Sequence, residues 1–234
     1  MTDLPTPGPI HLYSTTINHC NWLLDHAVSA ARQCEDSTAT LPKGESEEKQ
    51  KDALTSILFS VAATEAFINE LVYDCQQKIN KGEKDSKLKR FTWALRCAEE
   101  SNSTTKYKFE LAHLLLTGEP PKRDRNPFAD FYVLFGLRND IMHIQRPDTI
   151  VNRDDSASTP IPKRVENLIG RGLTRKMPEG YRTFWLIHLM TARVAWWACN
   201  AASDICKHIA LLVPNDEISS RYANNVDIAL QDDA

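Results

Sequence analysis

The chain has 234 residues, of which 42% are hydrophobic and 25% charged, and its formal net charge is -3. These values exclude a wholly disordered or collagen-like chain, and at about 100 to 200 residues per domain they suit one domain spanning the chain. No apolar run approaches the roughly 18 residues that cross a bilayer, and no signal-peptide pattern opens the sequence. We therefore expect a cytoplasmic protein of residues 1–234 with no membrane partner.

Charge and spacing also restrict the chemistry. A slightly acidic chain has no global attraction for phosphate, so any contact with nucleic acid has to be local. The six cysteines include no Cys-x-x-Cys pair, and the seven histidines nowhere show His-x-x-x-His spacing. We expect buried, reduced thiols, and neither a metal site nor a cofactor.

Helical periodicity recurs along almost the whole chain, without a hairpin signal of the Asn-Gly type. Ser46 is a suitable N-cap for a long second helix that stops before Gly82. Asn126 and Pro127 mark the start of a fifth helix, which Pro147 limits. The predicted helices span residues 15–35, 46–81, 86–100, 105–116, 127–145 and 182–212. The expected fold class is an all-α helical bundle.

Two segments do not fit a plain bundle. Residues 147–180 are polar and broken by prolines and glycines, and a structureless connection of this length is uncommon within a domain. We interpret them as a functional loop or an insertion. Residues 215–234 form a polar, acidic tail that we expect to be frayed.

Apolar side chains recur in the third and last helices. The third helix supplies the apolar contacts Leu88, Phe91, Trp93 and Leu95. The last helix carries His188 within an apolar stripe that begins at Trp185, so His188 is interpreted as a core residue rather than a ligand.

Charged residues interrupt the apolar faces of two helices. Arg138 lies in the core stripe of the fifth helix, together with Phe135 and Met142. Glu65 and Asn69 interrupt the apolar face of the second helix. Because an unpaired buried charge is costly, we expect Glu65 and Arg138 to form a buried pair, which either fixes helix register or belongs to a site.

The neighbours of Arg138 favour a site. Asn139 and His143 are four residues apart and share a ridge beside it, and Gly136 on the same flank permits close approach. A guanidinium suits a phosphate, and an imidazole exchanges protons near neutral pH.

The segment Leu137-Arg-Asn-Asp-Ile-Met-His143 resembles the Arg-x(4–6)-His signature of the HEPN (higher eukaryotes and prokaryotes nucleotide-binding) superfamily. Upstream, Glu65-Ala-Phe-Ile-Asn69 resembles a stretch found in an earlier helix of many such proteins. The resemblance covers residues 52–147. It implies a HEPN-type bundle with additional N- and C-terminal helices and one long loop insertion, whose motif-bearing core spans residues 46–147.

The resemblance implies a metal-independent endoribonuclease of the toxin or antiphage (antiviral) defence type, which works as a homodimer with two motifs facing each other. Arg138 is expected to hold the scissile phosphate, and His143 to act as the general acid or base. Asn139 is expected to orient the phosphate or the imidazole. The expected supporting residues are Glu65, which would buttress Arg138, with Asn69 and Asp140.

Two cationic runs flank the motif, in residues 76–90 and 160–176, and a solvated face is the more common explanation for each. The second directly follows the motif, so we prefer it for phosphate contacts. Tyr132 is a candidate for base stacking or for a dimer contact. The candidate RNA-binding residues are Lys163, Arg164, Arg171, Arg175, Lys176 and Tyr132.

Two other functions stay open. A non-catalytic protein of the same fold would bind a nucleotide or RNA, and a purely structural module would use the Glu65–Arg138 pair to specify packing. An antitoxin or another regulatory partner is a further expectation.

Overall fold

The structure, a computed structural model, describes residues 19–35, 46–143, 161–174 and 185–226. Every regular element within these ranges is helical, which confirms the all-α fold class. The elements are α1 (His19–Glu35), α2 (Ser46–Asn80), α3 (Ser86–Glu100), α4 (Thr105–Thr117), α5 (Phe128–Met142), α7 (Lys163–Gly170), the short 3-10 helix η1 (Trp185–Leu189), α8 (Ala192–Leu212) and α9 (Asp216–Val226).

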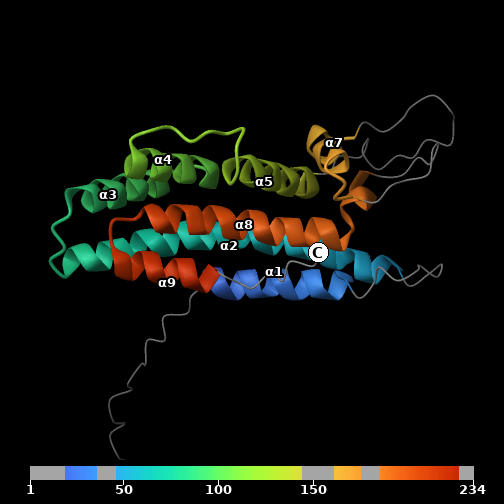
Figure 1. Cartoon of the computed structure of the whole chain (residues 1–234), viewed down its shortest axis with the longest axis horizontal. Coiled ribbons are helices and arrows are strands. Elements are labelled where there is room, and N and C mark those ends of the chain that lie inside the picture. The colour runs from blue at the N-terminus through green and yellow to red at the C-terminus, as the bar shows by residue number, and fades with distance from the viewer. Residues whose placement is uncertain (1–18, 36–45, 144–160, 175–184, 227–234) are drawn as a thin grey trace, which may run out of the picture.

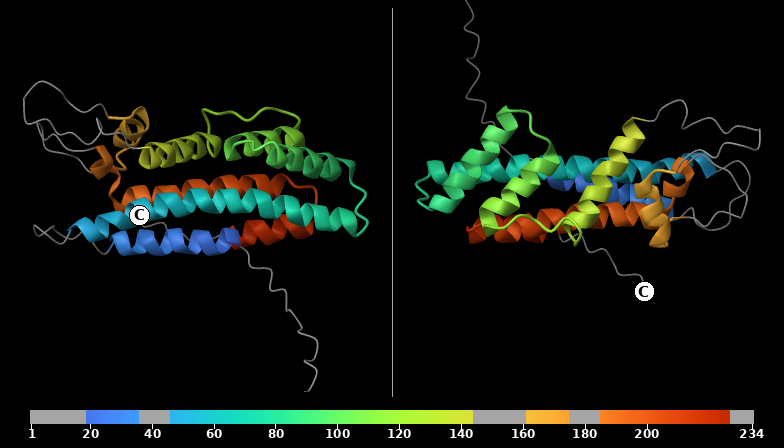
Figure 2. Two further views of the ribbon diagram at one scale, coloured as in Figure 1. Left: turned by 180° about the vertical axis from the view of Figure 1, so that it is seen from behind. Right: turned by 90° about the horizontal axis from the view of Figure 1, so that it is seen from above.

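The helices form two layers along the length of the molecule (Figure 1). In the lower layer the long helices α2 and α8 run side by side, and α1 and α9 pack against them on the side away from α3, α4 and α5. The shorter helices α3, α4 and α5 cross obliquely over them in the second layer, and α7 lies beyond the end of α5 (Figure 2). Helix α2 contacts both layers, so it is the central helix of the bundle.

Large aromatic side chains fill the space between the layers. Phe67 of α2 stacks on Phe109 of α4, with 6.0 Å between the ring centroids, and Phe109 packs on Phe131 of α5 at 4.7 Å. Burying each such side chain stabilises the fold by about 1.5 to 3 kcal/mol. The aromatic contacts therefore hold α4 and α5 on the central helix.

The central helix contains an apolar stretch that meets the length and hydropathy criteria for a membrane-spanning helix. By length and composition alone, residues Lys51–Asn80 could cross a bilayer. Half of the apolar window lies buried inside the bundle, and a core helix of a soluble protein can meet the same criteria of length and composition.

The single long helix predicted over residues 182–212 is wrong. Its described part consists of η1, a break at Met190 and Thr191, and then α8. Thr191 ends the continuity because its side chain accepts a hydrogen bond from the Val194 N–H (3.2 Å) and caps a new helix. His188 is only 8% exposed, so its assignment to the core is confirmed.

The prediction of a frayed tail from residue 215 is wrong for its first half. Helix α9 begins after Asn215, whose side chain accepts from the Ile218 N–H at 3.1 Å. Ile218 and Tyr222, four residues apart, are both buried, and the Tyr222 hydroxyl donates to Asp74 at 3.0 Å. Packing on α2 and α8 therefore orders this helix, whereas residues 227–234 lie outside the described residues.

The segment predicted as a loop insertion contains helix α7, which buries Val165 and Leu168. The rest of that insertion, residues 147–160 and 175–180, lies outside the described residues. Helix α5 ends at Met142, three residues before its predicted end, and Met142 is 57% exposed rather than in the core.

Trp93, predicted to supply an apolar contact of the third helix, has a side chain that is 70% exposed, so this prediction is wrong. Helix α3 buries Leu88, Phe91 and Leu95, and a residue two positions from Phe91 and Leu95 projects from the opposite side of the helix.

Candidate functional site at the end of helix α5

The residues of the Arg-x4-His motif lie in the last turn and the C-cap of α5. Arg138 is half-buried, and its Nη1 donates to the Asn139 Oδ1 at 3.1 Å. His143 caps the helix through its backbone N–H, which donates to the Asn139 carbonyl at 3.0 Å, and its side chain is exposed. Three polar groups therefore meet at one end of α5, although no direct hydrogen bond joins the side chains of Arg138 and His143.

The negative charge beside the motif is already paired. Asp140 accepts from Arg164 Nη1 at 3.1 Å and 3.0 Å through its two oxygens. Arg138, in contrast, has no carboxylate of the described residues within ion-pair distance. Among these residues, the half-buried guanidinium of Arg138 is thus left with the neutral Asn139 as its partner.

Gly136 lets α7 approach α5 at this point. A Cβ atom placed on Gly136 would lie 1.8 Å from Arg164 Nε and 2.2 Å from its Cδ, so the arginine side chain lies directly across the glycine. A second pair joins the same two segments, because Arg171 binds both oxygens of Asp130 at 2.5 Å and 3.2 Å.

Two of the predicted RNA-binding cations are therefore tied to α5 through the aspartates Asp140 and Asp130. Arg164 and Arg171 fasten α7 and its following turn to the helix that carries the motif. Lys163 is exposed and forms no ion pair with a described residue. Arg175 and Lys176 lie outside the described residues.

The predicted buried pair of Glu65 and Arg138 is wrong. Glu65 faces α4 instead, where it accepts from the Thr105 hydroxyl at 3.4 Å. Asn69, one turn along α2, accepts from the Lys108 ammonium at 3.4 Å. Helical spacing identifies the inner face of a helix but not the neighbour that this face meets.

Lys108 is a buried charge that was not among the residues predicted from the sequence. It is only 8% exposed and forms an ion pair with Glu99. Burial lowers the pKa of Lys108, and the nearby Glu65 carboxylate partly opposes this shift. The sequence did contain one indication of this burial, because Lys108 lies four residues before the buried Ala112 and therefore on the same face of α4. Since Glu65 takes part here, the packing role proposed for a Glu65–Arg138 pair loses its basis.

Tyr132 is half-buried on α5, where its ring packs against the core and lies between two cations. The Arg123 guanidinium is 5.5 Å and the Lys106 ammonium 5.9 Å from its ring centroid. A base stacking on this ring would have to displace a cation. The Tyr132 hydroxyl is buried and has no hydrogen-bond partner among the described residues.

Within the described ranges, no group of three or more His, Cys, Asp or Glu side chains has a geometry that could hold a metal ion. The chain matches no protein-family model, no curated protein and no solved structure. Its function therefore has to be inferred from its own residues.

Proposed function

We propose that the chain is a metal-independent endoribonuclease of the HEPN type, a toxin or antiviral-defence enzyme acting in the cytoplasm as a homodimer. The observation that carries this proposal is the half-buried Arg138, which lacks a carboxylate partner among the described residues and lies in the same turn and cap as the exposed His143. The proposed partners are RNA, a second copy of the chain and an antitoxin or regulatory protein.

A guanidinium that pairs with no carboxylate of the described residues favours an anionic ligand at this position. The one acidic residue within the motif, Asp140, is neutralised by Arg164 and does not compete for Arg138. A partly desolvated charge interacts more strongly than one in water, and a guanidinium matches the geometry of a phosphate. In this proposal Asn139 positions Arg138 through their hydrogen bond, and Arg138 stabilises the charge that develops on the phosphate.

The proposed reaction is an internal transfer within RNA. The ribose 2′-oxygen attacks the adjacent phosphorus as a base removes its proton, and the bond from phosphorus to the 5′-oxygen breaks as an acid protonates that oxygen. The products are a 2′,3′-cyclic phosphate and a 5′-hydroxyl. One motif supplies one histidine, so two copies of His143 in a symmetric dimer supply the base and the acid. The exposed Met142 beside it suits an apolar contact between the copies.

The test uses the full chain with single-stranded RNA in excess EDTA. We expect cleavage to cyclic-phosphate ends, and a rate loss of at least about 100-fold in Arg138→Ala and in His143→Ala. Arg32→Ala, which removes an exposed arginine from α1, is the matched control and should cleave like the parent.

Two results would overturn the proposal: no RNA cleavage under any condition, or unchanged cleavage by His143→Ala. RNA binding without cleavage, lost in Arg138→Ala, would instead identify a non-catalytic binding protein.

A further inference from the structure

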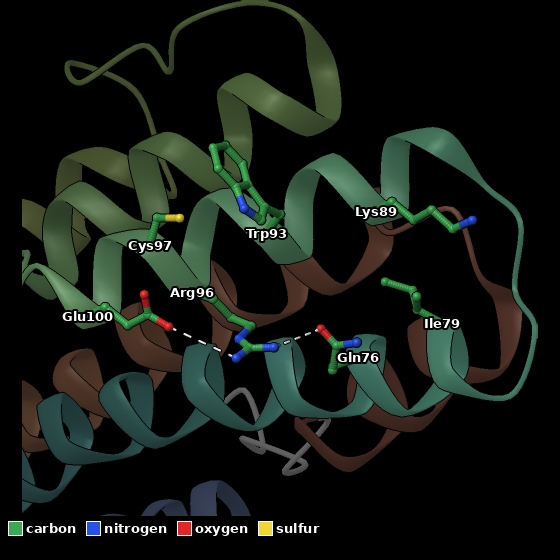
Figure 3. A pocket seen from close by; sticks show the side chains of 7 residues that line it. All are labelled: Gln76, Ile79, Lys89, Trp93, Arg96, Cys97 and Glu100. Carbon is green, nitrogen blue, oxygen red and sulfur yellow. Dashed lines mark hydrogen bonds and ion pairs between the residues drawn. The ribbon is translucent and has the colours of Figure 1, made fainter.

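An exposed tryptophan on α3 borders two grooves at the end of the molecule opposite α7 (Figure 1), and Figure 3 shows the residues of the first groove. Trp93 and Cys97 line both grooves, which have volumes of about 290 Å³ and 550 Å³. The first groove lies between α3 and α2, where Arg96 donates to Gln76 at 3.2 Å. The second lies toward α4 and includes Tyr107, which is 50% exposed.

The turn from α2 into α3 and the first half of α3 are strongly cationic. Residues 81–96 contain six lysines and arginines but only two acidic residues. Both acids are engaged by backbone N–H groups: Glu83 accepts from Lys84 and from Asp85, and Asp85 caps α3 by accepting from Leu88. The cations without an ion pair to any described residue are Lys81, Lys84, Lys87, Lys89 and Arg90.

The aromatic side chain and the cations share one face of α3. Lys89 and Arg90 precede Trp93 by four and three residues, so they lie one turn away on the same side of the helix. Arg96 is shared with Glu100 at 4.0 Å, so within the described chain Lys89 and Arg90 remain as the unpaired cations next to the indole. We call Lys89, Arg90, Trp93, Arg96 and Tyr107 the Trp93 surface.

We infer that the Trp93 surface binds single-stranded RNA, an inference that rests on the proposed function and adds a second contact region for its substrate. A base stacks on the Trp93 indole, and the adjoining phosphates contact Lys89 and Arg90. Lysine is depleted in protein interfaces, so the run of four lysines in residues 81–89 that leads into the Trp93 surface fits a polyanion better than a partner protein. The ion pairs of Arg164 and Arg171 support the same conclusion, because these two cations belong to residues 160–176, the other cationic run considered for RNA binding, and are already paired with aspartates.

The position of the Trp93 surface determines which substrates use it. Helices α3, α4 and α5 follow one another along the upper layer, with the Trp93 surface at one end and the motif at the other (Figures 1 and 2). A long RNA can contact both regions, whereas a dinucleotide can occupy only the motif. The Trp93 surface therefore increases the affinity for long RNA without taking part in the chemical step.

The binding experiment uses the His143→Ala chain, to prevent turnover, and a fluorescein-labelled single-stranded RNA of about 20 nucleotides. We expect Trp93→Ala to raise the Kd measured by fluorescence anisotropy roughly tenfold. Replacing Lys89 and Arg90 together by alanine should reduce the slope of log K against log salt by about 1.4, or about 0.7 for each phosphate contact. Trp22→Ala is the matched control, because Trp22 of α1 is 54% exposed and lies in the other layer.

Cys97 provides a second readout that needs no substitution in the Trp93 surface. It is exposed, whereas the other five cysteines are buried. Bound RNA should slow the alkylation of Cys97 by iodoacetamide several-fold, and the same RNA should give no protection in Trp93→Ala.

The inference is overturned if Trp93→Ala and the Lys89/Arg90 double variant both bind RNA within about twofold of the parent, or if Trp22→Ala weakens binding equally. A change of molar mass in Trp93→Ala by light scattering would identify a protein interface instead and would also overturn it.

Cleavage of the dinucleotide uridylyl-adenosine separates the two proposals. If Trp93→Ala loses binding to long RNA and the parent does not cleave the dinucleotide, the ribonuclease proposal is rejected and the RNA-binding surface is retained. If the parent cleaves the dinucleotide and Trp93→Ala binds long RNA as the parent does, the RNA-binding surface is rejected and the ribonuclease proposal is retained.

Discussion

At the scale of single residues, Gly136 determines how closely α7 approaches the candidate site. The Arg164 side chain occupies the position that a Cβ atom on residue 136 would take, and from there it pairs with Asp140. The pair has a structural and an electrostatic consequence. It fastens α7 to α5, and it neutralises the carboxylate that would otherwise compete for Arg138.

We predict that Gly136→Ala and Arg164→Ala are energetically coupled. Alanine in place of a helical glycine stabilises by about 1 kcal/mol, but in the parent chain it also displaces Arg164 from Asp140. An exposed ion pair contributes about 0 to 1 kcal/mol, so the two effects nearly cancel. In the Arg164→Ala background the full gain from alanine should remain.

Urea unfolding of the four proteins in this double-mutant cycle measures the coupling. We expect Gly136→Ala to stabilise the Arg164→Ala chain by at least about 0.5 kcal/mol more than it stabilises the parent. Effects that add within about 0.3 kcal/mol would show that Arg164 does not lie across Gly136 in solution.

At the scale of helices, a histidine pair joins α4 to α8. His113 Nδ1 and His208 Nε2 are 3.1 Å apart, the rings stack at 5.2 Å between centroids, and Phe128 of α5 packs against both. Burial lowers the pKa of His113 below its usual value of 6.5, with a smaller opposing effect of Glu119. The pKa of His208 is lowered by burial and then by the positive charge that His113 can carry.

We predict that this pair makes the bundle less stable in mild acid. Because both folded-state pKa values are below the unfolded value, the unfolded chain binds protons more readily. The contribution of the pair to stability is complete above the unfolded pKa of 6.5 and is lost progressively as the pH falls toward the lowered values.

Urea unfolding at about pH 7.5 and pH 5.5 tests this dependence. His208→Gln should flatten the difference between the two free energies of unfolding. A larger acid sensitivity in His208→Gln than in the parent would show that the histidine pair does not destabilise the bundle in acid.

At the scale of the whole molecule, the upper layer carries the two regions proposed to contact RNA at its opposite ends (Figure 1). The net charge of -3 describes only an average, because residues 81–96 are cationic and the motif presents a guanidinium that pairs with no carboxylate of the described residues. In the proposed function, recognition of RNA would therefore depend on local surfaces and on the assembly of two copies rather than on overall attraction.

We predict that Met142→Glu prevents formation of the proposed homodimer. Met142 is 57% exposed at the end of α5, so a glutamate there should leave the fold intact, but the two copies would then bring like charges together. Light scattering should show a monomer, and RNA cleavage should fall with it, while the thermal midpoint stays unchanged. Leu211→Glu on α8, where leucine is 59% exposed, is the control. A parent chain that is itself strictly monomeric would contradict the composite site.

The sequence by itself determined the all-α class and most of the helix boundaries, because helical periodicity and capping residues act locally. Helices α2, α3 and α4 begin at their predicted residues and end within one residue of the predicted position. Helix α9 was missed because a short helix has little stability of its own and depends on burying Ile218 and Tyr222. Trp93 is exposed because α3 turns its opposite side, with Leu88, Phe91 and Leu95, toward the core.

Only the tertiary structure decided which charges meet. The sequence predicted that Glu65 and Arg138 lie on the inner faces of their helices. In the structure α4 packs on α2, so Glu65 accepts a hydrogen bond from Thr105 instead. Arg138 pairs with no carboxylate of the described residues. The tertiary structure also shows that Arg164 and Arg171 form ion pairs with aspartates of α5. A helical pattern specifies the direction of a side chain around its own axis, whereas an ion pair depends on the distance between two helices, which no local pattern contains.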